Sequence, residues 1–137
     1  MAPMIGILIL SHGAFGESLI HSASHVLGKR PLYLRQIGIT VHDDPDAMVP
    51  VGEDLIRFLD QGAGVLVMSD LYGATPSNIA ARLLQPGRVE GVAGVNLPML
   101  IRALSYRDQP LATALSKAMA GGADGICLIP HSSSNDA

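Results

Sequence analysis

Residues 5–10 form one apolar run that ends abruptly in Ser11, His12 and Gly13. A run this short, rich in Ile and Leu and without polar alternation, is typical of a strand buried on both faces. Gly13 lets the chain turn, and a helical pattern follows it. His12 is therefore predicted to stand at the carboxyl end of a central strand and to face a helix N-terminus. In open α/β sheets this edge is where ligands bind.

The rest of the chain alternates between strand and helix patterns. Short apolar runs predict strands at residues 4–10, 32–39, 65–69 and 89–95, and helical spacing predicts helices at residues 15–27, 46–60, 76–84, 99–106 and 111–120. This alternation is typical of an open, mainly parallel α/β sheet with helices on both faces, and the expected strand order is 2-1-3-4. Gly121 and Gly122 are expected to end the last helix. A short fifth strand is expected at residues 124–129, and the pattern does not fix its direction.

The composition is that of one folded domain. We expect the domain to occupy residues 1–129 of the 137 and the Ser-rich residues 130–137 to form a disordered tail. Hydrophobic residues make up 48% of the chain and charged residues 15%, a balance that favours a buried core over disorder. The net charge of −3 gives no basic footprint for nucleic acid.

Cysteine usage and the first residues favour a cytoplasmic location. Cys127 is the single cysteine, so no internal disulfide can form, and a reducing compartment fits this usage. The first residues lack the cationic region of a signal peptide, and no segment reaches the ~20 apolar residues of a membrane span.

Asp70 is the expected partner of His12. It follows the apolar run at residues 65–69, and strands one and three are neighbours in the order 2-1-3-4. A carboxylate bonded to Nδ1 of His12 would fix the tautomer and leave Nε2 free to attack, as in the serine protease triad. Considered alone, Asp70 could equally be a turn residue before Gly73 without a role in the site.

The loop at residues 70–78 is the richest in polar and turn residues. Thr75 is expected to cap the helix that begins at Pro76. A helix N-terminus is also an anion site, so Thr75 and neighbouring amides could bond a phosphoryl group.

Other readings of the same residues stay open at this point. A receiver-type signalling domain would be phosphorylated on Asp70, but it needs acidic metal ligands where this chain has Ser11 and His12. A metal-dependent hydrolase would need His42 and Asp43 to converge with the first pair, whereas a solvated loop is the favoured reading of those two residues. The chain has neither a G-x-G-x-x-G motif after the first strand nor a P-loop lysine, which argues against nucleotide binding.

Three motifs together resemble a known family. Ser11-His12-Gly13 follows the first strand, residues 70–78 (Asp-Leu-Tyr-Gly-Ala-Thr-Pro-Ser-Asn) follow the third, and residues 94–100 (Gly-Val-Asn-Leu-Pro-Met-Leu) follow the fourth. In this order and spacing they resemble the IIA component (EIIA) of the mannose family of the sugar phosphotransferase system (PTS). The resemblance covers residues 4–129.

The resemblance implies a role for the site residues. By it, His12 accepts a phosphoryl group on Nε2 from the phosphocarrier protein HPr and passes it to an EIIB protein, and Asp70 orients the imidazole. Thr75 matches a hydroxyl residue that contacts the phosphoryl group, and the expected phosphoryl-binding set is Gly13, Ala74 and Thr75. An apolar rim for partner docking is expected at Phe15, Leu71 and Tyr72. No metal or other cofactor is expected.

The resemblance also carries expectations about assembly. The family sheet has an antiparallel fifth strand that some members exchange in a dimer, so a homodimer is expected, with residues 124–129 as the strand. The chain ends after the IIA unit, so EIIB is expected to be a separate protein and contact with a membrane permease to be indirect. Tyr72, Ala74 and Thr75 depart from the usual loop, and Ala74 narrows the backbone freedom of a glycine. A regulatory phosphoprotein and the IIA-like subunit of dihydroxyacetone kinase are the related alternatives.

Overall fold

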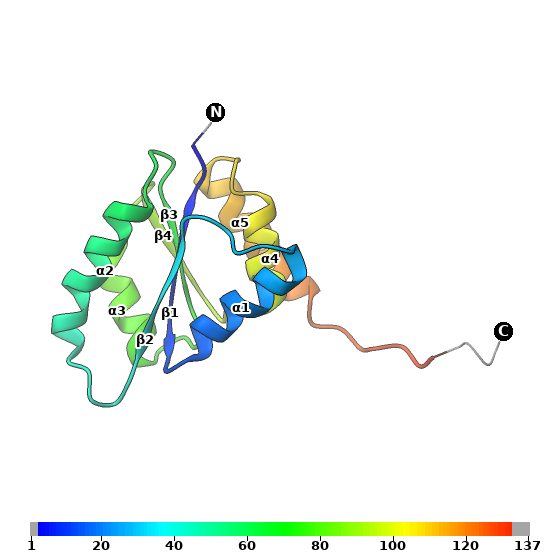
Figure 1. Cartoon of the computed structure of the whole chain (residues 1–137), viewed down its shortest axis with the longest axis horizontal. Helices are drawn as coiled ribbons and strands as arrows, with labels where there is room; N and C mark the ends of the chain where they lie inside the picture. Colours follow the sequence, from blue (N-terminus) through cyan, green and yellow to red (C-terminus); the bar gives the residue numbers. More distant parts are fainter. Residues whose placement is uncertain (1–2, 133–137) are drawn as a thin grey trace.

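The computed structural model describes residues 3–132. A four-stranded parallel sheet in the order β2-β1-β3-β4 forms its centre, as predicted. The elements are β1 (Gly6–His12), α1 (Phe15–Leu27), β2 (Leu34–Ile39), α2 (Pro45–Leu59), β3 (Val65–Ser69), α3 (Thr75–Leu83), β4 (Val89–Ala93), α4 (Leu97–Ser105) and α5 (Leu111–Asp124). Figure 1 shows α1, α4 and α5 on one face of the sheet and α2 and α3 on the other.

The alternation of side chains along β1 divides the core into two layers. Ile7 and Ile9 pack with α1, α4 and α5, whereas Leu8 and Leu10 pack with α2 and α3. All four side chains are fully buried, which is why the strand reads as a continuous apolar run.

β1 continues two residues further than the sequence pattern indicates, because its polar end is still paired. Ser11 and His12 lie opposite Gly38 and Ile39 of β2 in the parallel ladder. The strand therefore delivers His12 directly to the carboxyl edge of the sheet, where α1 begins (Figure 1).

The prediction of a fifth strand is wrong for the single chain, because residues 3–132 contain no strand after α5. α5 runs through Gly121 and Gly122 to Asp124, and residues 125–132 form neither helix nor strand. The two glycines stay helical because they let α5 approach α4 closely: a Cβ on Gly121 would lie 2.5 Å from the Cβ of Arg102. The contact offsets the poor helix propensity of glycine. After Gly125 the chain extends away from the body of the domain (Figure 1).

The predicted disordered tail at residues 130–137 falls mostly outside the described residues. Of that range the structure describes residues 130–132, which are exposed and lie outside any helix or strand. Within residues 3–132, no helix is both long enough and apolar enough to span a bilayer.

Arg107 holds the opposite, amino-terminal end of the sheet together. Its side chain is buried, and it donates to the carbonyls of Ile5, Leu32 and Tyr33 at 2.7–3.0 Å. Its own carbonyl accepts from the Ile5 N–H at 2.8 Å. One residue thus joins the starts of β1 and β2.

Gly38 of β2 fixes the turn that follows His12, and replacing it tests that packing. A Cβ on Gly38 would lie 2.1 Å from the carbonyl oxygen of Gly13, a backbone atom that cannot move without moving the turn. We expect Gly38→Ala to lower the free energy of unfolding by about 1–3 kcal/mol and to shift the amide NMR signals of His12 and Gly13.

Gly91→Ala on β4 is the matched control, because its Cβ would meet only the flexible end of Leu84, at 3.0 Å. Urea unfolding of the two variants checks the difference. Equal losses of stability would show that the turn does not depend on Gly38.

Candidate functional site

His12 and Asp70 meet at the carboxyl edge of the sheet. The backbone N–H of His12 donates to Asp70 Oδ2 at 2.9 Å, and His12 Nδ1 lies 2.8 Å from the same oxygen. An ionised carboxylate can only accept, so Nδ1 carries the proton and Nε2 presents its lone pair. The His12 side chain is 53% exposed and the Asp70 side chain only 13%, so the imidazole is the accessible member of the pair.

The environment of Asp70 keeps its carboxyl ionised. Burial raises its pKa, but the hydrogen bonds from the His12 backbone and imidazole outweigh burial, and the pKa lies below the ordinary 3.8. The second oxygen, Oδ1, is buried and has no hydrogen-bond partner among residues 3–132. Both His12 contacts fall on the other oxygen, Oδ2, of the ionised carboxylate.

Ser11 appears in the sequence motif around His12 but was given no role of its own there. It is fully buried, and its hydroxyl accepts from the Gly16 N–H at 2.8 Å. A Cβ on Gly16 would lie 2.9 Å from that hydroxyl, so glycine is needed there. The bond ties the first turn of α1 to the strand end that carries His12. The only sequence signal for this bond was that Ser11 and Gly16 lie on either side of His12 and Gly13.

The N-terminus of α3 follows Asp70 and has no side-chain cap among the described residues. Ala74 is the N-cap and Thr75 is the first helical residue, so the predicted capping role of Thr75 is wrong. Thr75 is displaced into the helix because Pro76 takes the second helical position and Ala74 is extended, with φ −87° and ψ 171°. The hydroxyl of Thr75 is left available to a ligand at this helix end.

The other predicted phosphoryl-binding residues differ in how free their amides are. The Gly13 N–H donates to the Ile39 carbonyl at 2.9 Å, and Gly13 makes the turn with φ +53°. The Ala74 N–H donates to the Leu71 carbonyl at 3.3 Å, a long bond. Both amides thus have a backbone acceptor, and the bond of Ala74 is the longer of the two.

The predicted docking residues are all exposed, and they follow the two site residues in the chain within three positions. Phe15 is 42% exposed, Leu71 60% and Tyr72 85%. Exposed apolar side chains of this size beside a reactive group are typical of a partner-binding rim.

The predicted loop at His42 and Asp43 is held by its own hydrogen bonds. Asp43 accepts from the Thr40 backbone N–H at 2.7 Å, and the His42 N–H donates to the Thr40 hydroxyl at 3.3 Å. Across residues 3–132, no three His, Cys, Asp or Glu side chains gather in a way that could hold a metal ion.

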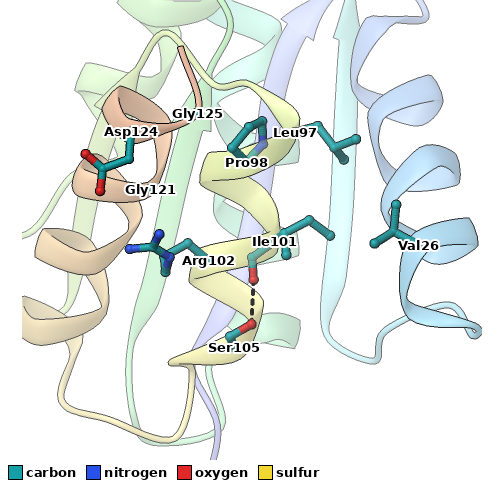
Figure 2. A pocket seen from close by; sticks show the side chains of 9 residues that line it. All are labelled: Val26, Leu97, Pro98, Ile101, Arg102, Ser105, Gly121, Asp124 and Gly125. Atoms are coloured by element: carbon teal, nitrogen blue, oxygen red, sulfur yellow. Dashed lines mark hydrogen bonds between the residues drawn. The ribbon is translucent and has the colours of Figure 1, made fainter. Parts of the chain in front are cut away.

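A hollow of about 430 Å³ on the outer side of the α1, α4 and α5 layer contains none of the predicted site residues. Figure 2 shows Val26 of α1 across from Leu97 and Ile101 of α4, whereas Arg102 extends toward α5. The Ser105 hydroxyl donates back to the Ile101 carbonyl at 2.9 Å. No nucleophile with an orienting partner lies in this hollow, so the His12 edge is the candidate site.

The comparison with known proteins decides the family. Residues 6–120 match the family model EIIA-man, described as the PTS system fructose IIA component. The chain belongs to this family.

Individual relatives agree with the family match. The chain is 31% identical over 105 residues to the mannose-specific EIIAB component of the PTS of Escherichia coli K12, covering 76% of this chain and 32% of that protein. This chain thus spans about a third of the length of that relative. It is also 28% identical over 106 residues to the fructose-specific EIIA component of Bacillus subtilis, covering 77% of this chain and 72% of that protein.

A solved structure confirms the α/β architecture of this EIIA-type chain. The PTS IIA protein associated with the fucose utilization operon of Streptococcus pneumoniae superposes with a TM-score of 0.79 at 26% identity, covering 93% of this chain and 96% of that one. The open sheet with strand order 2-1-3-4, predicted from the sequence, is confirmed.

The lowered pKa of Asp70 predicts how stability depends on pH. Because the folded-state pKa lies below the unfolded value, the stabilising contribution is complete above about pH 3.8 and is lost as pH falls through the lower folded-state pKa. We expect Asp70→Asn to be less stable than the native protein at neutral pH and to lose that difference in strong acid. Urea unfolding across a pH series measures it.

Asp108→Asn is the matched control, because Asp108 is exposed and lies outside the site. A stability difference for Asp70→Asn that persists unchanged well below pH 3.8 would contradict the assignment.

Proposed function

We propose that this EIIA-type protein is a cytoplasmic phosphoryl carrier of the sugar PTS. In this proposal it accepts a phosphoryl group on His12 from phospho-HPr and passes the group to an EIIB protein. The one observation that carries the proposal is the hydrogen bond of 2.8 Å between His12 Nδ1 and Asp70, which leaves Nε2 of an exposed imidazole free to act as a nucleophile. The family membership supports the same reading.

The chemistry follows from the tautomer. Nε2 attacks the phosphorus of the donor phosphohistidine, the new N–P bond forms as the donor N–P bond breaks, and the donor imidazole leaves. His12 then carries the phosphoryl group and an additional positive charge, which the carboxylate of Asp70 stabilises. In the second step a nucleophile of EIIB attacks the same phosphorus, and His12 returns to its neutral state.

The phosphoryl oxygens would be held by the N-terminus of α3. Thr75 supplies a hydroxyl and the first-turn amides supply positive potential, which stabilises the equatorial oxygens of the transferring group. Ala74 and Gly13 contribute mainly by shaping the two turns, since both amides already have backbone acceptors. Phe15, Leu71 and Tyr72 would form the apolar rim on which HPr and EIIB dock in turn.

The test is phosphoryl transfer from labelled phosphoenolpyruvate through enzyme I and HPr. We expect a label on this protein that survives alkali and is lost in acid, as a phosphohistidine requires. His12→Ala should abolish labelling, and Asp70→Asn should slow it by at least ~10-fold because the tautomer is no longer fixed.

The exposed His21 of α1 gives a matched control, and His21→Ala should label like the native protein. An alkali-labile label that depends on Asp70 would replace the proposal with an acyl phosphate and a receiver-type role. Label that passes to a dihydroxyacetone kinase and not to EIIB would move the chain to the kinase-linked branch.

We also propose that the EIIA-type chain forms a homodimer through the segment after α5. Ile126, Leu128 and Ile129 are 78%, 92% and 85% exposed, an unusual density of free aliphatic surface on one short segment. In the dimer this segment would add a strand to the sheet of the second copy and bury these side chains.

Analytical ultracentrifugation tests the dimer. We expect the native protein to sediment as a dimer at micromolar concentration and Leu128→Lys to shift it toward monomer. Met119→Lys changes another exposed apolar residue, 54% exposed on α5, and should leave the dimer intact. A native protein that sediments as a monomer would overturn this part of the proposal.

A further inference from the structure

The end of the sheet opposite to His12 contains a second hollow, of about 510 Å³. It lies beside the start of β1, near the N-terminus in Figure 1, between the α1–β2 connection and the end of α4. Its walls combine two kinds of side chain: apolar Leu27, Leu32 and Leu104, and cationic Lys29, Arg30 and Arg107. Among residues 3–132, no carboxylate lines it. We refer to it as the basic hollow.

Arg107 is the unusual group in the basic hollow. Its side chain is 9% exposed, and among residues 3–132 it has no carboxylate partner. It makes four hydrogen bonds, all to carbonyl oxygens, whereas a guanidinium has five N–H donors. One N–H on Nη1 is left without a partner among the described residues.

Arg107 is buried without a counter-charge, and this affects its ionisation. Burial lowers the pKa of Arg107 to about 10, so the guanidinium remains charged at neutral pH. A buried charge that no ion pair neutralises is costly, and an anion bound beside it would offset part of that cost.

The neighbouring cations add to the same positive potential. Arg30 pairs with Glu17 at 3.1 Å, which neutralises one charge. Lys29 forms no ion pair in the part of the chain that the structure describes. Lys29 and Arg107 thus leave a net positive charge in a hollow whose other walls are aliphatic.

We propose that the basic hollow binds a small organic anion with an apolar body. The free guanidinium N–H and the Lys29 ammonium would take the anionic group, and the three leucines would cover the apolar body. The volume is in the range of small-molecule sites, and the mixed lining favours such a ligand over a bare inorganic anion or a neutral sugar. The proposal is independent of the carrier function of His12.

Naphthalene-1-sulfonate is a suitable probe, because it joins one fixed negative charge to an apolar ring system. We expect binding by isothermal titration calorimetry, with perturbed NMR signals at residues 27–32, Leu104 and the Arg107 side-chain Nε–H. Inorganic sulfate and neutral naphthalenemethanol should each bind at least ~10-fold more weakly, because each supplies one half of the interaction.

A pair of matched charge reversals tests the site. Lys29→Glu should weaken binding about tenfold or more, since it places a like charge beside the sulfonate. Lys117→Glu makes the same change at another exposed lysine, one that packs over the Tyr106 ring at 5.3 Å and does not line the hollow. It should change binding less than about twofold.

The outcomes separate cleanly. NMR perturbations confined to residues 126–129 or to the His12 edge, or equal losses for the two lysine variants, would overturn the proposal. So would binding of naphthalenemethanol as tight as that of the sulfonate. Because phosphoryl transfer through His12 is measured separately, failure of that transfer would leave this result unaffected.

Discussion

The placement of β1 at the centre of the sheet is the constraint on which the site depends. The strand is flanked by β2 and β3 and covered on both faces, so its register is strongly specified. Leu10 lies opposite Ser69, the last residue of β3. Asp70 therefore follows the end of β3 at the level where β1 continues for two more residues, Ser11 and His12. A one-residue slip of either strand would turn one of the two side chains to the opposite face of the sheet. The hydrogen bonds at 2.8 and 2.9 Å are the consequence of a register that the apolar core enforces.

The sequence carried enough information for the sheet and for the central pair of the site, but not for the details around them. The apolar runs at β1 and β3 and the family-like motifs were sufficient to place His12 beside Asp70. The end of α5 was missed because the Gly121–Gly122 pair suggests a helix stop, whereas the close approach to Arg102 makes those glycines part of the helix packing. The role of Ser11 was missed because a buried serine hydroxyl that accepts from the next helix depends on the three-dimensional path of the turn. The N-cap of α3 was likewise misplaced by one residue, because a Thr-Pro pair fits a helix that begins at either Thr75 or Pro76.

The site combines a fixed negative charge with a helix end of opposite potential. Asp70 keeps its charge because two donors of His12 converge on Oδ2, and its other oxygen stays buried without a partner. That charge favours the positive imidazole that forms when Nε2 gains a substituent. In the proposed function, the N-terminus of α3, which follows Asp70 in the chain, would stabilise the anionic group on Nε2. The negative charge comes from the Asp70 side chain, and the positive potential comes from the backbone of α3.

The amino-terminal end of the sheet carries positive charge, which comes from Lys29, Arg30 and Arg107. α1 and α4 end there, and helix C-termini attract cations, which accounts for Lys29 and Arg30 just after α1. The same explanation does not extend to Arg107, because every hydrogen bond of its guanidinium goes to the carbonyls of Ile5, Leu32 and Tyr33, which lie just before β1 and β2. Carbonyl dipoles can solvate that cation without cancelling its charge. A methylene-rich side chain of the same length would have filled the space but left those carbonyls without donors. The cation is therefore the consequence of joining β1 to β2, and the uncompensated charge beside a hollow is what makes this end of the sheet suited to an anion.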